Sequence, residues 1–499
     1  MAGIKSLAKE TVIYGVSSIL GRFLNWCLVP LYVYMFPTEE YGVVSYLYSF
    51  TAVLLVILNY GMETGFFRFA NKEKDPNLVY SSSLICVGST SLLFIALLSI
   101  LLKPVSNVIL LPEKSLFVWL LGVTVAIDAF SNLPFAYLRF KKKALRFALI
   151  KMLNVGINIG LNLFFLLLCP KLANNNPGLI SWFYEPLGGE AFGIGWIFVS
   201  NIISSSLVLV MLIPELRGFK YSVSGALLKK MLSYSWPLLI LGIAGILSQN
   251  MGQMMIPYLF IGEEEAARSM VGIYGANIKI AIVMVMFIQA FRYAYEPFIF
   301  SKAEKKGESK NKEYGDAMKF YIIFGLLIFL GVMFFLPILK YFISESYWPG
   351  LDVVPLMMAA EFCFGVFYNL SVWYKLTDRT QWGMYFSLIC FVMMLLLNVW
   401  LVRSIGIPRG YMGSAWAALI SYFIITVVSY FVGQKYYPIS YPIKRIACYI
   451  VFAGTLFVIG SVIAGVVPMR EVYLIRILLL LAYVFVIARL ELKRKFAKS

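Results

Sequence analysis

The fold is decided by residues Tyr41–Phe69, which read YGVVSYLYSFTAVLLVILNYGMETGFFRF, because the chain contains this stretch twice. The second copy, Tyr274–Phe300, reads YGANIKIAIVMVMFIQAFRYAYEPFIF and also opens on Tyr-Gly. Laid on each other without a gap, the copies place Glu63 on Glu296, each 22 residues after its opening tyrosine. In a helix this offset spans about 33 Å, close to the ~30 Å hydrocarbon core of a bilayer. The stretch therefore predicts a membrane-crossing helix that occurs twice.

The composition is that of a protein built into a membrane. Hydrophobic residues make up 61% of the 499-residue chain and charged residues 14%, and the mean hydropathy is +0.82. Soluble domains hold about half apolar and about a quarter charged residues. The apolar run after Lys5 and Lys9 is too long for the core of a cleavable signal peptide and carries no A-x-A site. We therefore expect it to remain as the first membrane helix.

Apolar segments of about 20 residues, the length that spans a bilayer, recur along the whole chain. Fourteen such segments lie near residues 11–36, 41–64, 80–102, 115–138, 147–169, 191–213, 233–260, 271–293, 317–337, 353–374, 383–402, 411–433, 446–467 and 472–488. An even number places both termini on one side of the membrane. The connections are short, so no soluble domain is predicted.

The basic residues indicate which side holds the termini. Of the 43 Lys and Arg residues, 32 lie on the side of the two termini and nine on the opposite side. By the positive-inside rule, both termini are predicted to be cytoplasmic. The net charge of +18 is then explained by the cations that set the orientation of the chain in the membrane. A nucleic-acid surface would instead need the cations on a water-exposed domain, so no nucleic-acid partner is predicted.

The chain has no histidine, and its six cysteines lie within or at the edge of apolar runs without CxxC spacing. These cysteines are interpreted as small buried hydrophobic residues. The absence of histidine excludes an imidazole-based triad or metal site, and any proton coupling must use carboxylates. No cofactor is predicted, and the chain is predicted not to be an enzyme.

Two further matches extend the repeat. Asn132, followed by Leu and then Tyr137, corresponds to Asn369, followed by Leu and then Tyr374. The sequence GIGW at residues 193–196 corresponds to GSAW at 413–416. Helices two, four and six thus match helices eight, ten and twelve. A shift of six helices preserves orientation and predicts two parallel repeats with a substrate site between them.

The repeat also predicts the domain organisation of this all-α, polytopic membrane protein. An N-terminal six-helix lobe is expected over residues 1–216 and a C-terminal six-helix lobe over 217–434. Residues 435–499 hold two additional helices and a basic cytoplasmic tail. These last helices have no counterpart in the repeat.

Two cations lie within predicted membrane helices: Arg22 near the centre of the first, and Lys279 a few turns below the external end of the eighth. Each charge at such depth costs about 2.5–3.5 kcal/mol on insertion scales. Two interpretations stay open. Each cation belongs to a structural ion pair, or together they form the cationic floor of a water-filled cavity that suits an anionic ligand.

Two carboxylates lie in similar positions of repeat-related helices. Asp128 and Glu361 stand four and eight residues before the matched asparagines, so they project from similar faces one turn apart. They either neutralise Arg22 and Lys279 or titrate and couple transport to an ion. The residues alone do not choose between these roles.

Five further charges stand at predicted cytoplasmic helix ends: Glu63, Arg68, Lys151, Arg292 and Glu296. Snorkelling or ion pairing at the interface explains such positions. The functional alternative assigns Arg292 to substrate binding, and Glu63 and Glu296 to charge balance or coupling.

Glycine and proline are concentrated in helices one and seven, notably at Pro30, Gly242, Gly245 and Pro257. Proline removes a backbone hydrogen bond and glycine permits close approach, so these helices can bend. Both residues are also frequent in membrane helices in general. The alternative to that neutral interpretation is that helices one and seven are paired gates.

Four strings of this sequence resemble those of bacterial oligosaccharide flippases, in the polysaccharide-transport branch of the multidrug/oligosaccharidyl-lipid/polysaccharide exporter superfamily. They are NYGMETGFFRFA (59–70), LPFAYLRFKKKALRFALIK (133–151), GIYGANIKIAIVMVMFIQAFRYAYEPFIF (272–300) and NLSVWYKLTDRTQWG (369–383). The resemblance covers helices one to twelve. It implies two six-helix lobes around a central cavity, often with two extra helices.

The resemblance also implies a function. Members of the family export a polyprenyl-pyrophosphate-linked oligosaccharide from the inner to the outer leaflet of the bacterial cytoplasmic membrane, for surface polysaccharide assembly. Their cationic cavity positions map to Arg22, Lys279 and Arg292. Expected partners are the lipid-linked oligosaccharide, membrane lipids and a counter-ion such as Na⁺ or H⁺.

Three other functions remain as alternatives. A multidrug antiporter of the same superfamily would need an acidic, cation-attracting cavity. A peptidoglycan-precursor flippase shares the superfamily and the lipid-linked type of substrate. A membrane-embedded glycan polymerase or ligase is disfavoured by the lack of histidine and of a large external loop.

Overall fold

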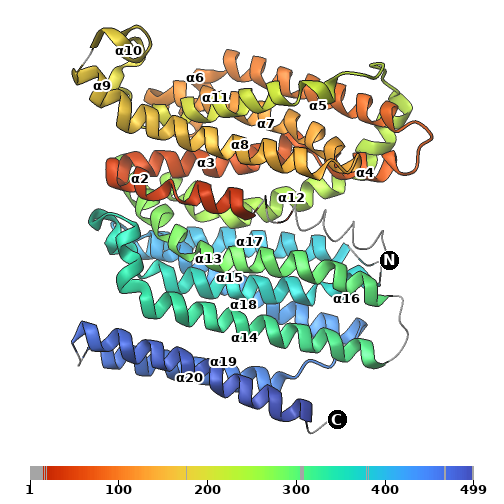
Figure 1. Cartoon of the computed structure of the whole chain (residues 1–499), viewed down its shortest axis with the longest axis vertical. Helices are drawn as coiled ribbons and strands as arrows, with labels where there is room; N and C mark the ends of the chain where they lie inside the picture. Colours follow the sequence, from red (N-terminus) through yellow and green to blue (C-terminus); the bar gives the residue numbers. More distant parts are fainter. Residues whose placement is uncertain are drawn as a thin grey trace. The chain divides into compact units, whose positions relative to one another are not determined.

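The structure is a computed structural model, and it is helical throughout the part of the chain that it describes. The described residues are 15, 17, 19–175, 177–303, 308–377, 379, 381–465 and 468–496. The chain divides into two compact units, Met1–Gly272 and Ile273–Ser499 (Figure 1). The lobe boundaries expected from the sequence repeat stay a prediction.

Among these residues, twelve helices are long and apolar enough to cross a membrane, and two shorter apolar helices, Ile19–Met35 and Gly195–Met211, accompany them. Each of the fourteen predicted segments falls on one of these helices. The prediction of an all-α polytopic membrane protein is therefore confirmed.

The N-terminal unit is arranged around α7. The helices of the unit are α2 (Val29–Met35), α3 (Thr38–Asn59), α4 (Met62–Ala70), α5 (Pro76–Ile100), α6 (Leu102–Val108), α7 (Ser115–Phe140), α8 (Ala144–Leu163), α9 (Cys169–Asn175), α10 (Pro177–Tyr184), α11 (Gly195–Met211) and α12 (Gly225–Leu259), followed by the first turns of α13 (Glu264–Ala303). Helix α7 packs against α3, α5, α8 and α11, while α12 packs against α3 and α4. Residues carried by α7 are therefore placed at the centre of this unit.

The helix predicted over Tyr41–Phe69 is interrupted. Tyr60 and Gly61 have φ angles of 31° and 72°, which separate α3 from α4. Glycine adopts positive φ without strain. At this break Ser235 of α12 donates its hydroxyl hydrogen bond to the Gly61 carbonyl at 3.2 Å. The break gives Glu63 a place in the separate helix α4.

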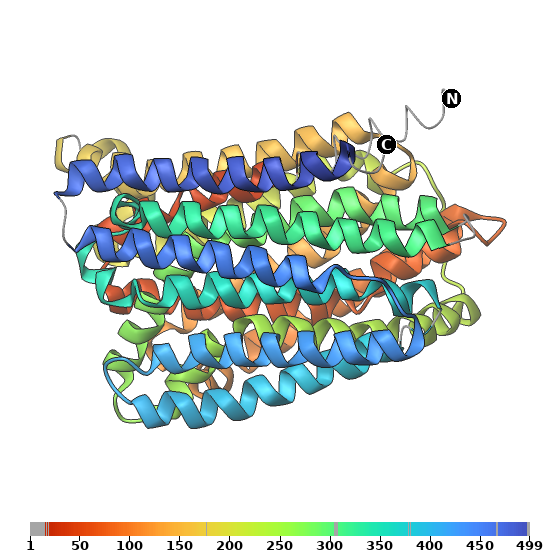
Figure 2. The ribbon, with the colours of Figure 1, turned by 90° about the horizontal axis from the view of Figure 1, so that it is seen from below.

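The C-terminal unit contains most of α13 and seven further helices. These are α14 (Glu308–Leu339), α15 (Val353–Leu370), α16 (Val372–Leu376), α17 (Gln381–Ile405), α18 (Tyr411–Tyr436), α19 (Ile443–Ala464) and α20 (Met469–Phe496). Helix α18 packs against α15 and α17, and α14 packs against α15, α19 and α20. Figure 2 shows the long helices of this unit, coloured green to blue, running nearly parallel.

The last helix, α20, is joined to α14 by polar contacts. Arg476 of α20 is buried and donates to the Phe334 carbonyl at 2.7 Å. Tyr483 donates to the Ile323 carbonyl at 2.9 Å, and Lys319 lies 2.6 Å from the Glu491 carboxylate. Sequence analysis assigned no role to Arg476, although a charge inside an apolar helix needs such acceptors.

Candidate functional site

Helix one carries Arg22 and packs against α8. A Cβ at Gly21 would lie 3.4 Å from a methyl group of Val155, and Tyr32 donates a hydrogen bond to Asn162 at 2.9 Å. The Arg22 side chain itself is exposed. Its positive charge acts on Lys151 of α8. Arg22 is therefore carried by a helix that packs on α8.

Lys151 joins several of the predicted site residues in one group. Its ammonium lies 4.1 Å from the centroid of the Phe135 ring. It interacts favourably with the charges of Asp128 and Glu63 and unfavourably with those of Arg139 and Arg22. We call Arg22, Glu63, Asp128, Arg139 and Lys151 the N-terminal charge cluster. It holds three cations and two carboxylates.

Asp128 is the inner carboxylate of this cluster. It lies on α7. Ser205 of α11 donates a hydrogen bond to it, and the positive charge of Lys151 of α8 acts on it. Sequence analysis considered Arg22 as the partner of Asp128. Lys151 takes this place because α7 and α8 pack directly on each other.

Glu63 is the second carboxylate, and it forms an ion pair with Arg139. The guanidinium of Arg139 lies 5.0 Å from the centroid of the Phe67 ring, so the pair closes α4 onto the end of α7. Both side chains are about one-third exposed, at 38% for Glu63 and 33% for Arg139. Sequence analysis treated Arg139 as one cation of a basic loop. Its place in the last turn of α7, before the lysine run, was the available signal.

Glu361 has a different environment. It is half-buried on α15, and its charge interacts with the phenols of Tyr274, Tyr321 and Tyr422. Tyr321 donates to the Phe362 carbonyl at 3.2 Å, which fixes its ring beside α15. We call these four side chains the Glu361 phenol cluster. Its tyrosines lie on α13, α14 and α18, and no sequence pattern brought them together.

Lys279 and Arg292 lie on α13 within the C-terminal unit. Two residues before Lys279, Asn277 donates to the Tyr347 carbonyl at 2.8 Å and fixes this part of the helix. The Lys279 side chain is half-buried. Arg292 is exposed, and its guanidinium lies 4.2 Å from the centroid of the Tyr368 ring. The side chain of Glu296 lies outside the described residues.

The proposed gate residues occupy two kinds of position. Pro30 stands in the first turn of α2, just after helix one is interrupted at Cys27 and Leu28. Gly242, Gly245 and Pro257 lie in α12, which is continuous over its full length. A Cβ at Gly242 would lie 3.0 Å from a methyl group of Val56, whereas Gly245 faces open space. Their role in gating stays a prediction.

The acidic connections of the N-terminal unit lie close together at one end. Thr38 and Ser269 share a hydrogen bond of 2.8 Å, and Glu39 lies 3.5 Å from Arg268. A Cβ at Gly42 would lie 1.9 Å from the Arg268 carbonyl oxygen. Only glycine permits this approach of α3 to the first turns of α13.

More than half of the chain matches one protein-family model. Residues 7–302, well over half the chain, match the family model described as polysaccharide biosynthesis protein. This chain belongs to that family. The resemblance to polysaccharide flippases found in the sequence is thereby confirmed. No curated protein matches the chain.

Solved structures show which fold this member of the polysaccharide biosynthesis family has. A lipid II flippase, MurJ, in an inward closed conformation, matches with a TM-score of 0.73 at 13% identity, over 98% of this chain and 100% of that chain. An inward-facing multidrug resistance transporter of the MATE family, in the MOP superfamily, matches with a TM-score of 0.63 at 15% identity, over 86% and 95%. A MATE protein in a straight conformation gives 0.58 at 15% identity, over 89% and 96%. The chain is thus a multi-pass membrane protein with the fold of this transporter superfamily.

Proposed function

We propose that this protein is a flippase that moves a polyprenyl-pyrophosphate-linked oligosaccharide from the inner to the outer leaflet of the bacterial cytoplasmic membrane, with both termini in the cytoplasm. The observation that carries the proposal is the surplus of positive charge in the N-terminal charge cluster, with Arg22 exposed. An exposed arginine in a membrane helix calls for water or an anion beside it. A pyrophosphate supplies that anion through charge-assisted hydrogen bonds.

In this proposal, Arg22, Lys279 and Arg292 bind the pyrophosphate and glycan head while the lipid tail stays in the bilayer. The lobes over 1–216 and 217–434 move relative to each other, and the flexible positions of helices one and seven serve as gates. Outward movement of an anion is favourable in a cell with a negative interior, by about 2.3 kcal/mol per charge per 100 mV. The return of the empty carrier with bare cations opposes the same field. A counter-ion, Na⁺ or H⁺, acting at Glu361 therefore completes the cycle.

Architecture supports a flippase over a multidrug antiporter. The MurJ structure aligns with 98% of this chain, whereas the two MATE structures align with 86% and 89%. The shortfall is about the length of α19 and α20, the two helices that sequence analysis found outside the repeat. The same comparison keeps a peptidoglycan-precursor lipid as the second candidate substrate. If a strain that lacks the protein remains viable, a peptidoglycan precursor is not its substrate.

The test is export by charge variants in a deletion strain. We expect Arg22→Ala to abolish most surface glycan and to leave the lipid-linked oligosaccharide in the inner leaflet, and Arg22→Lys to retain part of the export. Lys72→Ala, which removes an exposed cation after α4, is the matched control. Full surface glycan in the combined Arg22→Ala, Lys279→Ala variant, at a normal membrane level, would show that the proposal is wrong.

An assay with purified protein separates the alternatives. A flippase binds pyrophosphate lipids and not lipophilic cations, whereas an antiporter shows the reverse preference. A polymerase or ligase would leave flipped but unpolymerised glycan in the outer leaflet after deletion. Trapping in the inner leaflet supports export as the function.

A further inference from the structure

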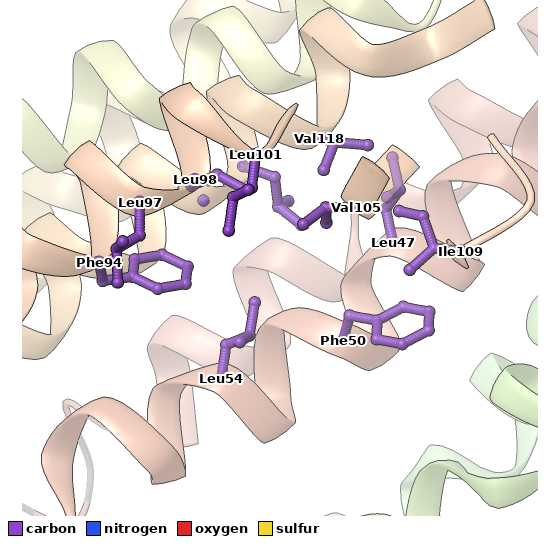
Figure 3. A pocket seen from close by; sticks show the side chains of 12 residues that line it. Leu47, Phe50, Leu54, Phe94, Leu97, Leu98, Leu101, Val105, Ile109 and Val118 are labelled. Atoms are coloured by element: carbon purple, nitrogen blue, oxygen red, sulfur yellow. The ribbon is translucent and has the colours of Figure 1, made fainter. Parts of the chain in front are cut away.

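The N-terminal unit contains an apolar cavity that the proposed function does not use. Its volume is about 310 Å³, and it lies between α3, α5, α6 and α7. Figure 3 shows Leu47, Phe50 and Leu54 of α3 facing side chains of the other helices across the space. Every lining residue is leucine, valine, isoleucine, phenylalanine or glycine. An apolar cavity of about 150 Å³ already stays dry and binds benzene, so this one suits a hydrocarbon and not water.

The cavity lies at the end of α7 opposite to Arg139 of the N-terminal charge cluster. Val118 and Leu121 line it from the first turns of α7, whereas Arg139 stands in the last turn of the same helix. None of its lining residues belongs to the proposed anion site. A ligand here would be distinct from the head group of the transported substrate.

The mouth of the cavity continues into the lipid-facing surface. Leu97 and Leu101 line the cavity and yet are 48% and 46% exposed. Ile100 beside them is 77% exposed, in α5, which is long and apolar enough to cross a membrane. In a bilayer such side chains are in contact with lipid chains. A chain that enters the cavity beside Leu97 and Leu101 stays in contact with apolar side chains.

A cation lies at the same end of the unit. Lys103 is exposed on α6, two residues from each of the lining residues Leu101 and Val105, and its long side chain can extend away from the helix. The break between α5 and α6 at Leu101 places it at the end of the membrane-spanning helix. A lysine at such a place extends to the head-group level, where it attracts a phosphate.

We propose that this cavity binds one acyl chain of an anionic membrane phospholipid, whose phosphate lies at Lys103. The lining supplies only hydrocarbon contacts, Leu97 and Leu101 open it to the surface of a membrane-spanning helix, and Lys103 supplies a positive charge at the same end. A phospholipid is the ligand present at the highest concentration at that mouth. The site is thus a resident-lipid site in the N-terminal unit, separate from export.

The test uses photoreactive lipids in vesicles of phosphatidylcholine and phosphatidylglycerol. A phosphatidylglycerol that carries a diazirine on its acyl chain should label the segment from Phe94 to Gly122 in the full-length protein. Val105→Phe fills the cavity and displaces roughly two methylenes of the chain, so labelling should fall about tenfold. Val108→Phe adds the same ring on the same helix, at an exposed position that does not line the cavity, and should leave labelling unchanged. Val118→Phe fills the cavity from α7, and thermal unfolding shows which variants are folded.

Each outcome decides part of the proposal. Equal labelling of folded Val105→Phe, Val118→Phe and Val108→Phe proteins would overturn the cavity site. Stronger labelling by a diazirine polyprenyl phosphate would overturn the choice of a phospholipid. Lys103→Ala should reduce phosphatidylglycerol labelling to the level of phosphatidylcholine, and equal labelling by both lipids in the unaltered protein would overturn the head-group contact. Glycan export by the Val105→Phe variant is measured separately and tests the proposed function alone.

Discussion

The two halves of the sequence repeat carry half-buried acids in different surroundings. Asp128 of α7 interacts with a cation, Lys151, and accepts a hydrogen bond from Ser205. Glu361, on the repeat-related helix α15, lies among three phenols. A carboxylate that faces a cation contributes to charge balance, and its loss leaves that cation uncompensated. A carboxylate among phenols has no such cation to compensate, so it can lose its charge at a lower cost. This makes Glu361 the better candidate for ion coupling.

The largest effect is expected from Asp128→Asn. We predict that it lowers the free energy of unfolding by about 3 kcal/mol, because Asp128 supplies the larger of the two carboxylate charges that favour the Lys151 ammonium. Thermal and denaturant unfolding of the purified protein measure this loss. Adding Lys151→Met should recover most of it, since the uncompensated cation is then absent. If Asp128→Asn unfolds like the unaltered protein, the contrast between the two acids is wrong.

The second largest effect on stability is expected at the ion pair of Glu63 and Arg139 in the N-terminal charge cluster. Glu63→Gln should cost about 1 kcal/mol of stability, less than Asp128→Asn, because the ion pair with Arg139 is one-third exposed and screened by water. The charge reversal of both residues, Glu63→Arg with Arg139→Glu, should restore part of that stability. High salt should reduce the difference between Glu63→Gln and the unaltered protein. If Glu63→Gln costs as much stability as Asp128→Asn, the expected difference between these two carboxylates is wrong.

Much of this fold follows from hydropathy alone, because each apolar segment must cross the bilayer as a helix. The position of a charge along its helix follows equally well, and Arg22, Asp128 and Lys279 all lie within apolar helices as expected. The partner of a charge does not follow, because it depends on how each helix is rotated against its neighbours. Thus sequence analysis did not pair Asp128 with Lys151.

The break at Gly61 is a second case in which local and tertiary structure act together. A Tyr-Gly pair permits positive φ at Gly61, where the second copy has Tyr293 followed by alanine, but an apolar run by itself favours a continuous helix. Packing of Ser235 against the Gly61 carbonyl selects the break. Glu63 therefore belongs to a short separate helix and reaches Arg139, which could not be expected from helical periodicity.

A smaller effect tests whether Arg292 has a role beyond packing. Tyr368→Leu removes the ring beneath its guanidinium and should cost about 0.5 kcal/mol, the value of an exposed cation–π contact. Tyr368→Phe keeps the ring and is the matched control. If Arg292 binds substrate, Arg292→Ala should lower export well below the level of Tyr368→Leu. Equal export by Arg292→Ala and Tyr368→Leu would assign Arg292 to packing alone.

The smallest effect on stability is expected from Glu361→Gln, and it is the sharpest test of the comparison. The amide has the shape of the acid and removes a charge that is costly to bury, while Tyr321 keeps its hydrogen bond to the Phe362 carbonyl. Stability should therefore change by less than about 0.5 kcal/mol. Export driven by an imposed Na⁺ or H⁺ gradient should nevertheless lose its dependence on that gradient, whereas a stabilised pair such as Asp128→Asn/Lys151→Met should keep it. The two acids would then be separated by function as well as by environment, since one would maintain the fold and the other the coupling. Gradient dependence that survives Glu361→Gln would instead place coupling outside the phenol cluster.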